Sequence, residues 1–393
     1  MMKNYKGIKI EIKPTIEQIE KINKTIGTGR FLYNFYIAYN KEIYEKEKRF
    51  VTGFEFSKYI NNVFVKENPD KSWIKDVSSK SNKQAIMNSE KAFKRFFKKI
   101  SGFPKFKKKS HNNQKCYFFK NNKTDFEFYR HKIKIPTLKF VRLKEYGYIP
   151  KNANIKSATI SKEGNRYFLS LILEMKKEIE NSISKKFETK EGIGIDLGIK
   201  DFATCSDGQV FKNINKTFKV RKIEKKLKKE QRKKSRKYLS CKKMGKNLYE
   251  CKNFQKQKLV IAKLLFRLNC IRNDYTNKVI NMLTKTKLKY ITIEDLKVSN
   301  MIKNRHLSKA ISQQKFYEFR TKLLNKCKEN NIELRIVSTF YPSSKLCSNC
   351  GHKKQDLKLK DRIYKCCDCG LEIDRDYNAS LNLRNSTQYT ILT

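Results

Sequence analysis

The stretch Ile193-Gly194-Ile195-Asp196-Leu197-Gly198-Ile199 decides the fold of the second half of this 393-residue chain. It is an apolar run of strand length with one carboxylate in its middle, which predicts a buried β-strand. Burying that carboxylate alone is unfavourable, so a metal ion or a cationic group should meet Asp196. The glycines let a ligand or another backbone approach the strand closely. The turn signal at Asp207-Gly208 then predicts two further strands, 202–205 and 209–211.

Two later segments place more carboxylates at the ends of predicted elements. Glu294 lies at the end of the alternating strand pattern of residues 289–296, and a short helix over 374–383 opens with Asp374 and Asp376. Acids on a first strand, a later strand and a late helix match an RNase H-like arrangement. Hard cations prefer oxygen ligands, and two Mg²⁺ ions about 3.5–4 Å apart can support phosphodiester cleavage. We therefore predict a two-magnesium nuclease site at Asp196, Glu294 and one of the two late aspartates.

Four cysteines have the spacing of a structural zinc site. Cys347 and Cys350 form one CxxC pair and Cys366 and Cys369 form another, and a glycine follows each pair. Four thiolates at this spacing predict a closed tetrahedral Zn²⁺ site; the alternative is a set of scattered, reduced core cysteines. Cys367 is left over by this spacing.

The chain has 11 cysteines and no export signal at its amino terminus, so we expect a cytoplasmic protein without a disulfide framework.

The charge of the chain indicates a polyanionic partner. Lysine and arginine number 91 against 38 acidic residues, which gives a net charge of +53. A lysine-rich proteome is the alternative explanation, but such a bias should also raise glutamate. The basic run of residues 216–243 predicts a helix that contacts phosphates through Lys225, Lys229 and Arg232, rather than a merely solvated face.

No stretch reaches the about 18 to 20 apolar residues that a spanning helix needs, so we expect no membrane partner.

The first half of the chain has a different pattern. A short strand at residues 8–12 precedes two predicted helices, 16–26 and one beginning near residue 30, and a further helix at 81–99. The aromatic residues of the second helix follow helical spacing, so we assign them to a core rather than to base stacking. From residue 116 to 175 the period changes to two, which predicts an antiparallel β-barrel or sheet that the first strand could join. Residues 176–190 read as a linker.

Seven segments, in this order, together resemble the transposon-encoded TnpB proteins and the related miniature type V-F CRISPR effectors. The matching segments are Arg30–Asn34, Gly102–Lys107, Gly194–Gly198, Ile293–Leu296, Cys347–Gly351, Cys366–Gly370 and Asp374–Leu383. The chain departs from the family at Asn277, where relatives often carry His, and at Ser380, where Ala is usual. Neither position belongs to the acidic triad.

The resemblance implies cleavage of double-stranded target DNA beside a short flanking motif, directed by a guide RNA. It makes Asp376 the third catalytic acid and Asp374 its supporting neighbour. The further nucleic-acid contacts that we expect on this basis are Arg30, Tyr33, Asn34, Lys105, Lys107, Lys108 and Arg272. A transposon-borne protein acts as a monomer in the family picture and a CRISPR-associated one as a dimer, and we favour the monomer.

The implied fold is a multidomain α+β chain. It has a β-barrel wedge domain (1–14 and 102–190), a helical recognition insert (15–101), a RuvC-type RNase H-like nuclease domain (191–340 and 371–393) and a zinc-binding insert (341–370). Three other functions stay open: a DNA-binding repressor of the same fold that no longer cuts, a resolvase-like nuclease without a bound RNA, and a type V-F CRISPR effector nuclease. The first should have lost an acid or a cysteine pair, and both are intact here.

Overall fold

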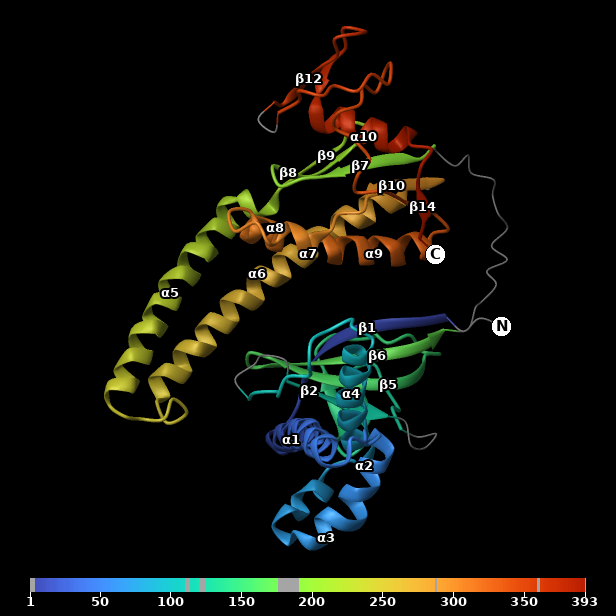
Figure 1. Cartoon of the computed structure of the whole chain (residues 1–393). Coiled ribbons are helices and arrows are strands. Elements are labelled where there is room, and N and C mark those ends of the chain that lie inside the picture. Colours follow the sequence, from blue (N-terminus) through green and yellow to red (C-terminus); the bar gives the residue numbers. More distant parts are fainter. Residues whose placement is uncertain are drawn as a thin grey trace. The chain divides into compact units, whose positions relative to one another are not determined.

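The structure is a computed structural model that describes residues 4–109, 114–119, 125–175, 191–286, 288–358 and 361–392. It divides into two compact units, Met1–Ser182 and Ile183–Thr393. The predicted linker at 176–190 lies outside the described residues. Figure 1 shows the elements of both units.

The first unit contains a six-stranded antiparallel sheet with the order β2-β5-β6-β1-β4-β3. Its strands are β1 (Asn4–Lys13), β2 (Gln114–Phe119), β3 (Lys132–Ile135), β4 (Lys139–Leu143), β5 (Asn154–Glu163) and β6 (Arg166–Met175). The first strand pairs with both β6 and β4, which confirms that it joins the later strands. Alternate side chains from these strands, among them Ile10, Val141 and Leu169, fill one core. Closure of this sheet into a barrel stays a prediction.

The helical part of the first unit differs from the prediction at its start. One helix, α1 (Ile16–Glu47), replaces the two that were expected. Thr15 and Gln18 form a capping box that fixes its beginning, and no proline interrupts it. The two glycines at 27 and 29 weaken a helix but do not end it when its neighbours pack on both sides.

The remaining helices of this unit surround an aromatic core. They are α2 (Gly53–Tyr59), a π-helical turn (Ile60–Phe64), α3 (Val65–Glu67), a 3-10 helix (Pro69–Asp76) and α4 (Ser79–Phe97). Tyr36 and Phe56 are fully buried in this core, and the Tyr36 hydroxyl donates a hydrogen bond to the Val51 carbonyl at 2.7 Å. The prediction that these aromatic residues form a core is confirmed.

The second unit has a mixed six-stranded sheet with the order β14-β11-β10-β7-β8-β9. The strands are β7 (Ile193–Leu197), β8 (Asp201–Cys205), β9 (Val210–Lys212), β10 (Tyr290–Glu294), β11 (Glu333–Val337) and β14 (Thr390–Ile391). The three strands β7, β10 and β11 run parallel, whereas β8 and β9 continue from β7 as antiparallel strands. The apolar strand that opens this half of the chain therefore lies inside the sheet, as its composition predicts.

Helices cover both faces of this sheet. Helix α10 (Arg375–Asn385) lies on one face, and α6 (Lys252–Lys285) and α9 (Phe316–Glu329) lie on the other (Figure 1). The short helices α7 (Val298–Met301) and α8 (Ser308–Gln314) and a 3-10 turn (Ile214–Lys216) complete this layer. Buried apolar side chains such as Ile293, Phe319 and Leu334 form the core between sheet and helices. A separate hairpin of β12 (Ile363–Lys365) and β13 (Glu372–Asp374) precedes α10.

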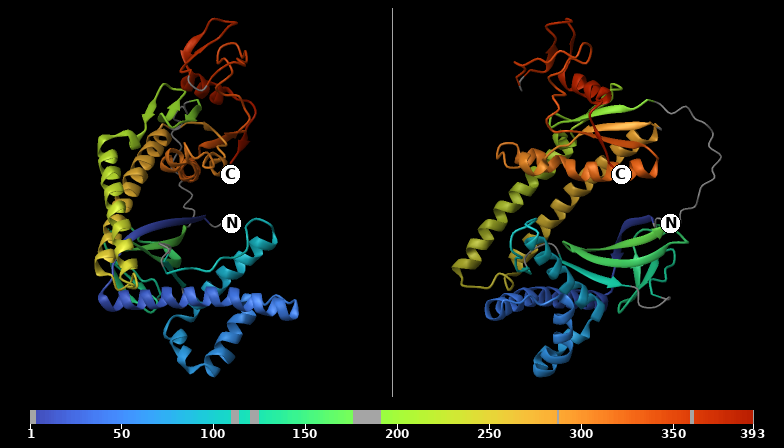
Figure 2. Two further views of the ribbon diagram at one scale, coloured as in Figure 1. Left: turned by 60° about the vertical axis from the view of Figure 1, so that its left-hand side comes forward. Right: turned by 45° about the vertical axis from the view of Figure 1, so that its right-hand side comes forward.

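The predicted basic helix is α5 (Phe218–Lys243), and it packs along the neighbouring helix α6 (Figure 2). Val220, Ile223 and Leu268 bury the contact between the two helices. Most of the exposed side chains of α5 are basic, although Phe218 and Leu239 are exposed as well. Within the described residues, no helix has the length and apolar character needed to cross a membrane.

Candidate active site and cysteine cluster

The sheet register places two of the predicted acids side by side. Strands β7 and β10 are parallel neighbours with Ile195 opposite Ile293, so the next residues, Asp196 and Glu294, reach the same edge of the sheet. Neighbouring residues of parallel strands point to the same face. The two carboxylates, 98 residues apart in the sequence, therefore share one site.

The third acid, Asp376, lies on α10, and the backbone of this helix packs directly against the backbone of β7. A Cβ atom on Gly194 would lie only 2.1 Å from the Ser380 carbonyl oxygen, so only glycine allows this approach. Asp376 lies in the first turn of α10, and its charge acts on Asp196 together with that of Glu294. The structure thus brings together the three acids that the sequence identified.

The carboxylates of this site have perturbed protonation. Burial, reinforced by the charges of Glu294 and Asp376, raises the pKa of Asp196 to about 8. Burial also raises the pKa of Glu294, against a hydrogen bond from Ser343 that lowers it. The Arg375 guanidinium lies 3.4 Å from the Asp376 carboxylate and supplies one positive charge. Half-buried acids that repel one another require more positive charge to ionise together, and their oxygen donors suit a hard divalent cation.

Asp374 is the other late aspartate, and it has a different position. It is the N-cap of α10, and its carboxylate accepts hydrogen bonds from the backbone N–H groups of Asp376 at 2.9 Å and Tyr377 at 3.0 Å. Since its oxygen holds the helix start, Asp374 orients the turn that carries Asp376. This geometry favours Asp376 as the third acid of the site. Asp295, next to Glu294, instead pairs with Lys297 and Arg320.

A loop after β11 supports the site, and no pattern in the sequence indicates this role. The Ser343 hydroxyl donates a hydrogen bond to Glu294, and the Thr339 hydroxyl donates one to the Asp295 carbonyl at 2.6 Å. Between these two anchors the Phe340 ring is 94% exposed. The loop therefore presents an apolar ring to solvent close to the strand ends that carry Glu294 and Asp295. These residues follow no helical or strand period, so only a structure could find them.

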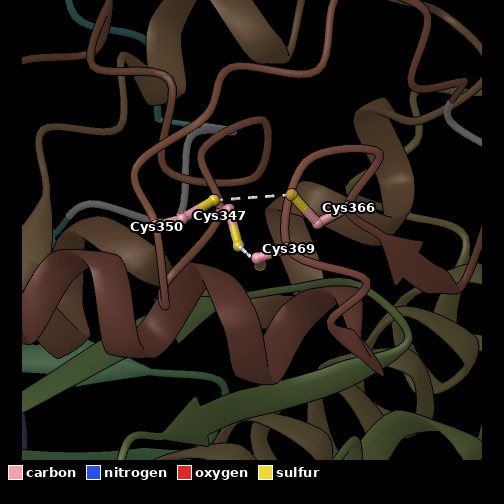
Figure 3. Close-up of side chains that lie close together, drawn as sticks. All are labelled: Cys347, Cys350, Cys366 and Cys369. Carbon is pink, nitrogen blue, oxygen red and sulfur yellow. Dashed lines mark hydrogen bonds between the residues drawn. The ribbon is translucent and has the colours of Figure 1, made fainter.

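The four predicted cysteines come together in one cluster (Figure 3). Their sulfur atoms all lie within 4.8 Å of one another, with 3.5 Å between Cys347 and Cys369 and 3.5 Å between Cys350 and Cys366. The glycines after each pair, Gly351 and Gly370, adopt positive φ angles of 77° and 70°, which bend the chain around the sulfurs. This group could hold a metal ion. The acids of the first site do not gather as tightly among the described residues.

Two buried asparagines connect the cysteine cluster to α10. The Asn378 side chain accepts from the Ser348 N–H at 2.9 Å and donates to the Leu346 carbonyl at 2.6 Å. The Asn382 side chain donates to the carbonyls of Ser343 at 2.8 Å and Leu346 at 2.7 Å. The helix that carries Asp376 therefore also holds the segment that carries Cys347. The sequence showed these asparagines within a motif but did not reveal their contacts.

The predicted nucleic-acid contacts of the second unit divide into two groups. Lys225, Lys229 and Arg232 are exposed on α5, as a phosphate contact requires. Arg272 instead lies half-buried and donates to Asn215 at 2.7 Å and Glu224 at 2.8 Å. Its guanidinium thus joins α6 to the start of α5. A contact of any of these residues with nucleic acid stays a prediction.

In the first unit, three of the predicted contacts interact with one another. The Asn34 side chain pairs with both backbone groups of Lys107, at 2.9 and 2.8 Å, and the Lys107 ammonium lies 3.6 Å from the centre of the Tyr33 ring. Tyr33 itself is buried. These residues fix the basic segment after Pro104 to α1, whereas Lys105 and Lys108 are exposed and Arg30 is half-buried. For Tyr33 and Asn34 the structure shows a positioning role.

Three family models match the chain. Residues 1–49 match a "Helix-turn-helix domain" of OrfB proteins of IS605 elements, residues 171–305 match a "Probable transposase" model of the same proteins, and residues 316–383 match the "Cas12f1-like, TNB domain". The putative RNA-guided DNA endonuclease InsQ of Escherichia coli (strain K12) is 28% identical over 97% of this chain and 92% of its own length. A putative RNA-guided DNA endonuclease of Streptomyces pristinaespiralis is 28% identical over 98% and 90%.

The chain is similar to proteins of the TnpB family along nearly its whole length. The resemblance found in the motifs is confirmed, and the match runs along nearly the full length of these relatives. The described part of residues 1–49 consists of β1 and one continuous helix, so the name of the helix-turn-helix model does not describe its local structure.

A solved structure shares the fold. The cryo-EM structure of a Cas12f1-sgRNA-target DNA complex aligns with a TM-score of 0.58 over 98% of this chain and 99% of the Cas12f1 chain, at 16% identity. This likeness confirms the predicted α+β fold, and the match of residues 316–383 adds a TNB domain to it. The finer division into wedge, recognition, RuvC and zinc-binding parts stays a prediction.

Proposed function

We propose that this protein is a transposon-associated, RNA-guided DNA endonuclease that cuts target DNA beside a short flanking motif. The observation that carries the proposal is the meeting of Asp196, Glu294 and Asp376 at one edge of the mixed sheet. The relatives that match over nearly the whole chain are named RNA-guided DNA endonucleases, which supports the same function. Guide RNA and double-stranded DNA are the proposed partners, and the net charge of +53 suits them.

The three acids are the proposed ligands of two Mg²⁺ ions. Their oxygen donors, and the raised pKa of the half-buried Asp196 carboxyl, fit a site that is completed by divalent cations. Bound Mg²⁺ would activate the attacking water and stabilise the leaving 3′ oxygen. The protein's own part is to hold the carboxylates: Ser343 orients Glu294 through its hydroxyl, and Asp374 orients the first turn of α10.

Other residues have proposed roles in holding the nucleic acid. Phe340, exposed between two anchored loop residues, offers a face on which a base of the cleaved strand can stack. The exposed basic residues of α5 would contact the phosphate backbone without reading its sequence. The four cysteines fit one structural Zn²⁺, because a set of four thiolates leaves no coordination position open for a substrate.

The proposal includes the division of the chain into four domains. Residues 191–340 and 371–393 would form the RuvC-type nuclease domain, and 341–370 its zinc-binding insert. Residues 1–14 and 102–190 would form the wedge domain around a recognition insert at 15–101. We propose that the protein acts as a monomer.

The proposal is tested with the purified full-length chain. We expect co-purifying RNA, seen as absorbance at 260 nm that RNase removes, and Mg²⁺-dependent cutting of a plasmid that carries the sequence matching that RNA. Asp196→Ala and Asp376→Ala should each abolish cutting and still bind the RNA and the target. Binding without cutting by the unaltered chain would instead indicate a repressor, and RNA-independent cutting would indicate a structure-selective nuclease.

A further inference from the structure

A second group of metal-ligand side chains lies beside the four-cysteine cluster. His352, Cys367 and Asp368 offer one nitrogen, one sulfur and one oxygen that all lie within 4.8 Å of one another. Cys367 is the cysteine that the CxxC spacing leaves over, and the proposed function uses none of the three residues. The donors of this group are therefore available for a role of their own.

The group forms a chain of contacts through the imidazole ring. The Cys367 sulfur lies 3.3 Å from Nε2 of His352, and Nδ1 of the same ring lies 2.9 Å from the Asp368 carboxylate. A tetrahedral Zn²⁺ bound by one thiolate and one imidazole holds those two donor atoms about 3.5 Å apart. The observed separation is thus close to the one that a shared cation needs.

The ring orientation also suits a metal ligand. Metal-bound histidines commonly donate their second N–H to a carboxylate, which fixes the tautomer and aims the free nitrogen at the ion. Asp368 is placed to accept that hydrogen bond and leaves Nε2 facing Cys367. The backbone of His352 is fixed as well, because its carbonyl accepts from the Cys347 N–H at 2.9 Å and from the Tyr364 hydroxyl at 3.3 Å.

We propose that His352 and Cys367 form a second, solvent-accessible site for a borderline or soft cation such as Zn²⁺, with Asp368 orienting the imidazole. Cys367 and Asp368 are exposed, so water can fill the remaining coordination positions. With two direct protein ligands the site should bind Zn²⁺ more weakly than the four-thiolate cluster does. The inference does not depend on the nuclease function.

Metal stoichiometry tests the proposal on the full-length protein. The chain is loaded with excess Zn²⁺, and zinc is counted by mass spectrometry before and after a wash with a weak chelator. We expect one equivalent that resists the wash and a second that is lost in it. In Cys367→Ser and in His352→Ala the weak equivalent should be missing and the tight one retained. Asp368→Asn should keep the weak site with about 10- to 100-fold lower affinity.

The control variant is Cys270→Ser, which removes another exposed cysteine from α6 and should behave as the unaltered chain. Co²⁺ gives a second readout, because a thiolate-to-cobalt charge-transfer band from the weak site should disappear in Cys367→Ser. A single equivalent in the unaltered chain would overturn the proposal, and so would a second equivalent that survives in Cys367→Ser. Loss of the tight equivalent in Cys367→Ser would also overturn it, because Cys367 would then belong to the four-cysteine cluster.

Discussion

Gly194 of β7 and Ser380 of α10 touch through their backbones, with no room for a side chain at the glycine. A Cβ at Gly194 would lie 2.1 Å from the Ser380 carbonyl oxygen and 2.4 Å from the Arg384 nitrogen. This contact sets the height of α10 above the sheet. Since β7 carries Asp196 and α10 carries Asp376, it also sets the distance between two of the proposed magnesium ligands.

Gly194→Ala should therefore damage both stability and activity. The added methyl must push α10 away from β7, and overpacking of this kind typically destabilises by about 1–3 kcal/mol. We expect a lower melting temperature and a loss of Mg²⁺-dependent cutting larger than the loss of folded protein explains. Gly7→Ala is the matched control in a strand, because nothing lies within 4 Å of the added Cβ. Equal melting temperatures and equal cutting activities of Gly194→Ala and Gly7→Ala would contradict the backbone contact.

Asp196→Asn should stabilise the Mg²⁺-free protein at alkaline pH. The pKa of Asp196 is raised to about 8 in the folded chain, so folding favours the neutral acid. The contribution of the neutral Asp196 side chain to the free energy of unfolding is fully present below the ordinary aspartate pKa. It is lost as pH rises through about 8. Without Mg²⁺, the melting temperature of Asp196→Asn should exceed that of the unaltered chain at pH 8 and equal it near pH 4.

Added Mg²⁺ should reverse that order at pH 8, because only the unaltered chain keeps the full set of ligands. Asp274→Asn, which alters an exposed carboxylate on α6, serves as the control and should show neither effect. If the melting temperature of Asp196→Asn instead equals that of the unaltered chain at every pH and Mg²⁺ concentration, Asp196 neither has a raised pKa nor needs a bound cation.

Ser343→Ala should move the pH profile of cutting to higher pH. The Ser343 hydroxyl donates to Glu294 and lowers its pKa, which burial raises. Without that hydrogen bond the pKa of Glu294 rises further, so the ionised ligand forms only at higher pH. We expect cutting at pH 6.5 to fall by about tenfold, as a loss of roughly 1.4 kcal/mol would give, and to recover largely at pH 8.5. Ser344→Ala is the neighbouring control, and a loss that is equal at both pH values would argue against this role.

Removal of positive charge from α5 should weaken binding in a salt-dependent way. Lys225, Lys229 and Arg232 are exposed there, and each phosphate contact contributes about 0.7 to 0.9 to the slope of log affinity against log salt. The triple glutamine variant should lose affinity for its RNA and show a flatter slope. A charge-conserving triple variant (Lys225→Arg, Lys229→Arg, Arg232→Lys) controls for shape. If the slope of log affinity against log salt is unchanged in the triple glutamine variant, the phosphate contacts lie on other surfaces of the protein.

The sequence predicted the elements of this site because each has a local signature. An apolar strand with one acid, a strand that ends on Glu294 and a helix that opens with aspartates can all be recognised within about ten residues. The residue pattern alone left the choice between Asp374 and Asp376 open, because both lie at the start of the predicted helix. Only the N-cap hydrogen bonds of Asp374 separate them.

Features that depend on tertiary contacts could not be predicted in this way. Two helices were predicted where α1 is one continuous helix, which runs through Gly27 and Gly29 with Ile26 and Thr28 buried beside them. Tyr33 and Asn34 looked like exposed recognition residues, although their partner is the backbone and ammonium of Lys107, 73 residues away from Asn34. Ser343 and Asn378 act through long-range hydrogen bonds that no periodic pattern records.

Cys350→Ser should release the tightly bound zinc and loosen the nuclease site as well. The variant breaks the four-thiolate cluster, and removing one ligand from a structural zinc site removes much of its folding energy. Because Asn378 joins α10 to the cysteine segment, we expect faster proteolysis within 341–370 and weaker cutting together. Cys367→Ser is the matched control one residue beyond Cys366, and it should keep the tight zinc and the resistance to proteolysis. Unchanged zinc content in Cys350→Ser would show that these four sulfurs do not share one ion.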